Sequence, residues 1–176
     1  MIRYLLSYLT FPGVIVHEFA HAWACRQMGV RVIKVCYLRF GNPPGYVLHG
    51  RPATALQHIV IATAPLFIST FVTLVISSGA GVYYVSQAAD YHDPILGSSL
   101  WLGFSFALHA FPSGGDADAL WDDVKSPDIS LAAKLLLVPV VGAIRLAGFG
   151  RYFWFDVIFA AAVTVAPFLF VLKALE

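Results

Sequence analysis

Long stretches of this chain carry no charged side chain, and short polar segments separate them. No Asp, Glu, Lys or Arg occurs over residues 52–89, and none occurs over residues 94–115. A helix needs about 20 mainly apolar residues to cross the hydrocarbon core of a bilayer, and both runs reach that length. The pattern therefore predicts an integral membrane protein.

The apolar runs predict mainly α-helical structure. Five helices are expected, at about 14–28, 54–78, 94–111, 131–149 and 153–172, with a stop at Gly29 and a kink at Pro65. Between the first two helices, the β-branched stretch VRVIKVCYLRF, the turn cluster GNPPG and the stretch YVLHG predict a small β-hairpin. We expect one domain over residues 1–176, a multi-pass transmembrane helical bundle with about 4–6 membrane segments. Its core region is expected at about 10–120, with accessory helices at about 131–176.

The composition agrees with a chain that lies in a bilayer. Hydrophobic residues make up 59% of the sequence and charged residues 12%, against roughly a quarter charged in ordinary soluble domains. The net charge is +1, and no basic patch with interleaved aromatic residues occurs, so a nucleic-acid partner is not expected. The lipid bilayer is the expected environment.

The distribution of basic residues predicts the orientation. Five basic and no acidic residues lie between the first two predicted helices, namely Arg26, Arg31, Lys34, Arg39 and Arg51. The loop after the second helix has no Lys or Arg. By the positive-inside rule the hairpin is cytoplasmic and the later loop, with Asp90, His92 and Asp93, is outside. The first and third helices then run in the same direction, so the C-terminal end of the first and the turn PSGGDAD are expected at the cytoplasmic face.

The segment HEFAH, residues 17–21, matches the pattern H-E-x-x-H. On a helix, His17 and His21 lie on one face and can bind one Zn²⁺, while Glu18 lies beside them as a base for the activated water. Ionisable side chains are costly inside a membrane segment, and their presence there predicts a function. The alternative interpretation is a pair of buried histidines with structural hydrogen bonds.

Catalytic zinc usually has three protein ligands. The only glutamates are Glu18 and the terminal Glu176, which disfavours a downstream glutamate ligand. His92 is predicted on the opposite side of the membrane. His49 and His58 are interpreted as a loop residue and a polar residue at a helix end.

Two aspartates remain as candidates for the third ligand. Asp116 and Asp118 follow Gly114-Gly115 just beyond the third predicted helix, at the expected cytoplasmic face. Either could instead cap the segment DADALWDDV. We favour Asp116 and keep Asp118 as the alternative.

The stretch FPGVIVHEFAHAWACRQMG, followed much later by HAFPSGGDA, resembles the site-2 protease family of intramembrane zinc metalloproteases. The resemblance covers about residues 10–120. It implies His17, His21 and Asp116 as zinc ligands and Glu18 as catalytic base. His109 stands where the family has an asparagine, and Ala117 stands where it has a glycine.

Three roles are open for His109: a polar helper that binds the substrate backbone or the developing oxyanion, an additional metal ligand, or a buried histidine bonded to a helix carbonyl. The expected function is a membrane-embedded zinc endopeptidase that cleaves a membrane-associated protein or peptide near the cytoplasmic face. The alternatives are a membrane-anchored zinc peptidase acting on soluble peptides and a non-catalytic scaffold or metal-binding pseudoprotease.

Overall fold

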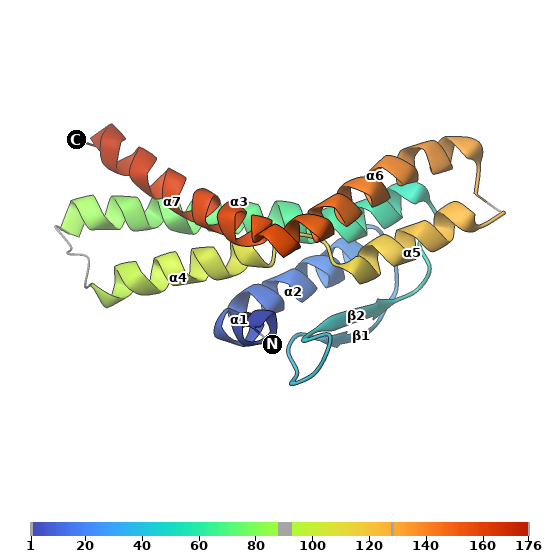
Figure 1. Ribbon diagram of the computed structural model, residues 1–176, viewed down its shortest axis with the longest axis horizontal. Coiled ribbons are helices and arrows are strands. Elements are labelled where there is room, and N and C mark those ends of the chain that lie inside the picture. The colour runs from blue at the N-terminus through green and yellow to red at the C-terminus, as the bar shows by residue number, and fades with distance from the viewer. Residues whose placement is uncertain (1, 88–92, 128, 176) are drawn as a thin grey trace.

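The computed structural model describes residues 2–87, 93–127 and 129–175, and these form a mainly helical protein with one small sheet (Figure 1). The elements are α1 (Ile2–Leu9), α2 (Phe11–Gln27), β1 (Val32–Cys36), β2 (Tyr46–His49), α3 (Ala55–Gln87), α4 (Pro94–Leu108), α5 (Gly114–Lys125), α6 (Leu131–Gly150), the 3₁₀ turn η1 (Arg151–Phe153) and α7 (Phe155–Leu175). The predicted helical class and the antiparallel hairpin between α2 and α3 are confirmed. Asp90, His92 and Asp128 lie outside the described residues.

The sequence sets both ends of α2, the helix that carries HEFAH. Pro12 stands in the first turn, where its missing N–H costs no hydrogen bond. The helix ends at Gln27, and Gly29 follows with a φ of 69°, a left-handed conformation that favours glycine. The buried Ala20 and Ala24 of α2 pack against Ile61 of α3. Small side chains on this face bring the two helices close together.

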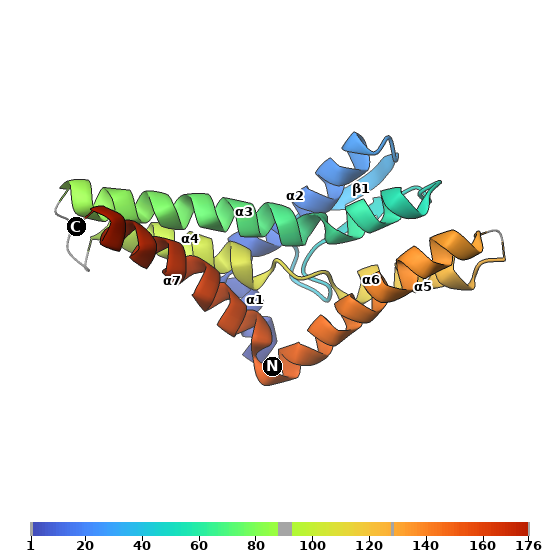
Figure 2. The same ribbon diagram turned by 90° about the horizontal axis from the view of Figure 1, so that it is seen from above.

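Helix α3 is the longest element of the structure. Its 33 residues span about 50 Å at 1.5 Å per residue. It continues past the predicted end near residue 78 because the sequence stays free of charge up to residue 89. From above, α2 lies along one half of α3, and α4 and α7 lie along the other (Figure 2). The helices α6 and α7 meet at a corner beside the N-terminus and diverge from it.

A close contact joins α2 to α4. A Cβ atom added to Gly13 would lie 1.9 Å from the backbone oxygen of Ser105 and 2.6 Å from Cδ2 of His109. The end of α4 therefore meets the N-terminal half of α2. The sequence predicted that the C-terminal end of α2 and the turn PSGGDAD emerge at the same face of the membrane, and it did not predict this contact.

Helix α5 packs against both α6 and α3. Ala117 and Leu120 of α5 lie in one apolar cluster with Leu137 and Val141 of α6 and Ala62 of α3. A buried hydrogen bond adds to this contact, because Nδ1 of His58 in α3 lies 2.5 Å from Oδ2 of Asp123 in α5. These contacts fix the position of the first turn of α5.

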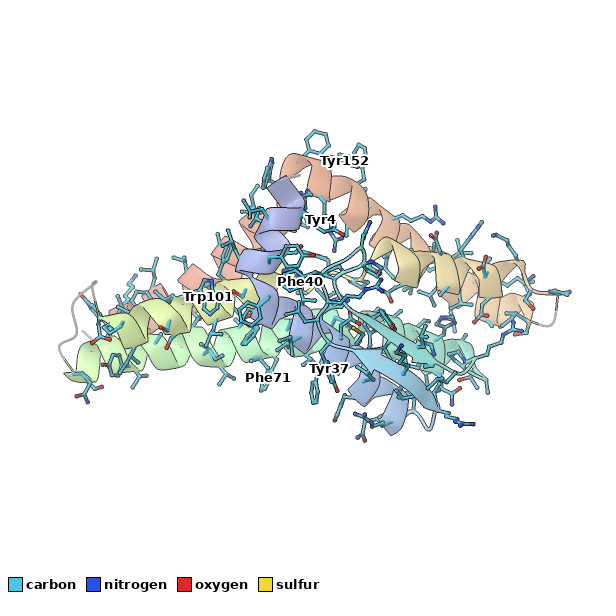
Figure 3. The ribbon with its side chains drawn as sticks, turned by 90° about the horizontal axis from the view of Figure 1, so that it is seen from below. Tyr4, Tyr37, Phe40, Phe71, Trp101 and Tyr152 are labelled. Carbon is cyan, nitrogen blue, oxygen red and sulfur yellow. The ribbon has the colours of Figure 1, made fainter. Side chains whose placement is uncertain are left out.

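Within the described residues, three helices are long and apolar enough to cross a membrane: α3, the unit Leu131–Phe153 and α7. The apolar helix α4 is shorter, with 15 residues, and α2 has 17. Large apolar side chains cover the outside of these helices; Phe71 projects from α3 and Trp101 from α4 (Figure 3). These features suggest a membrane protein with fewer long apolar helices than the 4–6 segments expected from the sequence.

Candidate metal centre

The structure brings His17, His21 and Asp116 together. One possible ligand atom from each residue lies within 4.8 Å of the other two. The Nε2 atoms of His17 and His21 are 3.1 Å apart, and Oδ1 of Asp116 is 3.5 Å from Nε2 of His21. A tetrahedral zinc ion with bonds of about 2.0–2.1 Å spaces its ligand atoms by about 3.3 Å. The three donor atoms therefore fit one small divalent cation.

Backbone carbonyl groups orient both imidazole rings. Nδ1 of His17 donates a hydrogen bond to the carbonyl oxygen of His109 at 2.6 Å. Nδ1 of His21 donates to the carbonyl oxygen of Ile61 at 2.9 Å. A carbonyl only accepts, so each Nδ1 carries the proton and each neutral ring keeps a lone pair on Nε2. Two lone pairs and a carboxylate oxygen then converge, and a bound cation would stabilise this arrangement.

A helix cap positions the third donor. Oδ2 of Asp116 accepts hydrogen bonds from the backbone N–H of Ser113 at 2.6 Å and from its hydroxyl at 2.7 Å. The hydroxyl oxygen of Ser113 accepts in return from the backbone N–H of Asp116 at 3.3 Å, which completes a capping box. These hydrogen bonds engage Oδ2, and Oδ1 of the same carboxylate faces the histidines. Asp116 thus combines the capping role with a place in the cluster of possible ligands.

The alternative ligand, Asp118, lies elsewhere. Its Oδ1 accepts a hydrogen bond from Arg145 of α6 at 3.0 Å, and its side chain is 72% exposed. His49 lines the same cavity as HEFAH, but its Nδ1 bonds to the neighbouring Gly50 carbonyl at 2.8 Å. His58 pairs with Asp123. None of these three residues belongs to the cluster of possible ligands found among the described residues.

The donor cluster opens into a cavity of about 430 Å³. Glu18 is buried and lines this cavity beside the two histidines. The hairpin turn forms another part of the wall, and a Cβ atom added to Gly45 would lie 2.6 Å from Cγ of Glu18. The absence of a side chain at Gly45 therefore makes room for the Glu18 carboxylate.

His109 contributes to the site through its backbone and its ring. Its carbonyl binds His17, and its ring nitrogen Nε2 lies 2.8 Å from the hydroxyl of Thr10. That hydroxyl donates to the carbonyl of Leu6 at 2.7 Å, so it accepts from Nε2–H of His109. In this tautomer Nδ1 of the neutral ring is an acceptor. The ring lines the cavity and does not belong to the ligand cluster.

Several residues of the site carried no functional signal in the sequence. The carbonyls of Ile61 and His109 act through the backbone, which every residue has. Ser113 could have been found from the spacing S-x-x-D at the start of a helix. Arg151 also lines the cavity. In the sequence, only its position between two apolar segments could have marked it as a candidate site residue.

No known family model, curated protein or solved structure matches this chain. The arrangement of the site is therefore the basis for a functional assignment.

Proposed function

We propose that the protein is a membrane-embedded zinc metalloendopeptidase that hydrolyses peptide bonds of membrane-associated substrates. The observation that carries the proposal is the convergence of His17, His21 and Asp116 beside a buried glutamate in one cavity. Two imidazoles and one carboxylate, with a position left for water, are a typical donor set for catalytic zinc. The resemblance of HEFAH and HAFPSGGDA to the site-2 protease family supports the same assignment.

The residues around the cavity have distinct roles in this proposal. His17, His21 and Asp116 would hold the ion, which would lower the pKa of a bound water to about 7 and polarise a carbonyl group. Glu18 accepts the proton of the attacking water and passes it to the leaving amine. His109 presents Nδ1 as an acceptor, so it binds a backbone N–H of the substrate. This role matches the polar helper among the alternatives considered for His109.

The hairpin suggests how a substrate enters. A transmembrane helix has its carbonyls engaged in its own hydrogen bonds, so it must unwind before cleavage. Tyr46, Val47 and His49 of β2 line the cavity, as does the turn before them. The outer edge of β2 can add an extended peptide by strand pairing, and the turn covers the mouth of the cavity. The basic residues of this hairpin favour a cavity near the cytoplasmic face.

The first test is Glu18→Gln. This variant keeps all three ligands, so it should bind one zinc ion per chain as the wild type does. Its cleavage of peptides embedded in detergent micelles should fall at least about a hundredfold, because a general base contributes about 10²–10⁴-fold. Metal content and cleavage are measured on the same purified samples. Retained proteolysis in Glu18→Gln would reject the proposed mechanism.

The same assay separates the alternative functions. A membrane-anchored peptidase for soluble substrates would cleave a water-soluble peptide as fast as a micelle-embedded segment. A scaffold or pseudoprotease would cleave neither, even in the wild type loaded with zinc. The proposed function requires cleavage of the embedded segment.

A further inference from the structure

Arg151 places a guanidinium group in the wall of the cavity that holds the three donors. It belongs to η1, the turn between α6 and α7, and Figure 2 shows this corner beside α1. Arg151 also lines a second cavity of about 180 Å³, together with Arg3 and Asp156. It therefore stands between the candidate metal centre and a small group of charged residues.

The charges around Arg151 do not balance. Asp156 accepts hydrogen bonds from Arg3 at 2.6 Å on Oδ2 and 3.3 Å on Oδ1. Nε of Arg151 lies 4.0 Å from the same Oδ2, so one carboxylate serves two guanidinium groups, and Arg3 has the closer contacts. On the other side, a divalent cation would offset the carboxylates of Asp116 and Glu18. One positive charge, on Arg151, then remains in the cavity wall.

The hydrogen-bonding capacity of Arg151 is also unfilled. A guanidinium has five N–H donors. Within the described chain, the side chain of Arg151 makes one hydrogen bond, from Nη2 to the carbonyl of Phe111 at 3.1 Å. Its Nε is buried and has no hydrogen-bond partner there. A buried donor without an acceptor is unfavourable, so an acceptor from a bound molecule would stabilise this site.

We propose that Arg151 binds a carboxylate of the substrate and so determines specificity. The inference rests on the proposed peptidase function and names its substrate class: peptides with a carboxylate near the scissile bond. The two oxygens of a carboxylate can accept two parallel N–H bonds from a guanidinium, and charge-assisted pairs of this kind are among the stronger hydrogen bonds. The carboxylate comes either from an acidic side chain or from a free C-terminus.

The test measures binding, so it does not depend on cleavage. The probes are four fluorescent succinyl-hydroxamate dipeptides, whose hydroxamate binds zinc in the donor cluster. They end in a leucine carboxylate, a leucine carboxamide, an aspartate carboxamide or an asparagine carboxamide. Dissociation constants are measured by anisotropy with the zinc-loaded wild type in detergent. We expect at least one probe with a carboxylate to bind at least about tenfold more tightly than the probe that carries a carboxamide in its place. The probe pair that shows the preference identifies the source of the carboxylate.

Two variants locate the effect. Arg151→Gln should abolish the preference and leave the affinity for the neutral probes unchanged. Arg145→Gln is the matched control, because Arg145 pairs with Asp118 and does not line either cavity. Should Arg151→Gln fail to fold, Arg151→Lys is the second variant. It keeps the positive charge but lacks the planar pair of N–H donors, so it should reduce the preference for carboxylate probes.

Failure of the proposed role of Arg151 can be distinguished from failure of the proposed metal centre. Equal affinities of the wild type for charged and neutral probes would overturn the role of Arg151 and leave the peptidase proposal intact. The role of Arg151 would also be overturned by an unchanged preference in a folded Arg151→Gln. If no hydroxamate binds the zinc-treated protein, the metal centre itself is wrong and both proposals fall.

Discussion

At the scale of single residues, HEFAH depends on partners that its own sequence does not contain. His17 and His21 each use Nδ1 to bind a carbonyl, one from the end of α4 and one from α3. Those bonds set the tautomer and point both Nε2 atoms at the same place. Metal affinity is therefore expected to depend on α3 and α4 as well as on the histidines.

The two aspartates after Gly114-Gly115 give a matched pair of variants. Asp116→Ala should lower bound zinc from one ion per chain to a small fraction, because Oδ1 of Asp116 faces the histidines. Asp118→Ala should keep its zinc, because Asp118 pairs with Arg145. The measurement is metal content after dialysis against a weak chelator. The reverse pattern would make Asp118 the ligand.

Asp116 is also a capping residue, and a separate variant isolates that role. Ser113→Ala removes the capping hydroxyl and leaves the carboxylate of Asp116 in place. It should cost about 1 kcal/mol of stability, as loss of a helix cap does, while zinc remains bound. Zinc loss in both variants would point to folding of α5 rather than to a ligand.

The sequence alone narrowed the candidates for a third ligand to two residues and favoured Asp116 without excluding Asp118. The choice depends on the direction in which each carboxylate leaves α5, and Arg145, 27 positions away, holds Asp118 outside the site. Arg151 was not predicted for the same reason. Its contact with the cavity arises only when α7 packs against α3 and α4. Such contacts are properties of the tertiary structure.

At the scale of elements, the hairpin contributes a wall of the cavity as well as a loop between helices. Gly45 lies against Glu18, and Cβ at this position would also be 3.1 Å from the carbonyl oxygen of Cys36. The hairpin turn and Glu18 are therefore packed together. Tyr8 of α1 stacks on Phe40 with ring centroids 5.3 Å apart, which helps to fix the turn; Figure 3 shows Phe40 beside α1.

Gly45→Ala tests this packing. The added methyl group should displace the Glu18 carboxylate and reduce cleavage by about 10–100-fold, because a displacement of about 1 Å can have that effect. Zinc content should be unchanged. The control is Gly41→Ala in the same turn, where the nearest atom would be 3.5 Å away on the Arg39 side chain. Equal activity of the two variants would show that the turn does not constrain Glu18.

The elements themselves followed from simple rules of sequence. Gly29 predicted the end of α2 and the β-branched stretches predicted the hairpin, whereas α2 begins at Phe11, earlier than the predicted start at about residue 14. The helices α1 and α5 were not predicted, and neither were the break between α1 and α2 at Thr10 and the full length of α3. That break and the end of α3 depend on packing against other helices, since the local sequence stays apolar across both positions.

At the scale of the whole molecule, the buried pair of His58 and Asp123 joins the two parts of the candidate site. Asp123 lies near the end of α5, whose first turn holds Asp116, and His58 lies in α3, which binds His21 through Ile61. Both side chains are less than a tenth exposed. The pair is therefore expected to couple the stability of the fold to metal binding.

Asp123→Ala tests this coupling. It leaves His58 buried without its partner, which should reduce the free energy of unfolding by about 1–3 kcal/mol. The affinity for zinc should fall in parallel, although neither residue is a ligand. Thermal unfolding in detergent and zinc titration are the measurements. Arg51→Ala is the control, because Arg51 also contacts Asp123 but its side chain is 65% exposed, so both quantities should change little. An unchanged affinity in Asp123→Ala would show that the two parts are independent.

The distance along the chain between the donors has a consequence for biosynthesis. His17 and His21 leave the ribosome early, but Asp116 follows only after α3 and α4 have been made. At translation rates of about 5–20 residues per second, that interval lasts about 5–20 s. During this time the nascent chain holds an incomplete donor set. A newly made copy therefore cannot bind a cation through all three donors until α3 and α4 have been made, although α6 and α7 still follow.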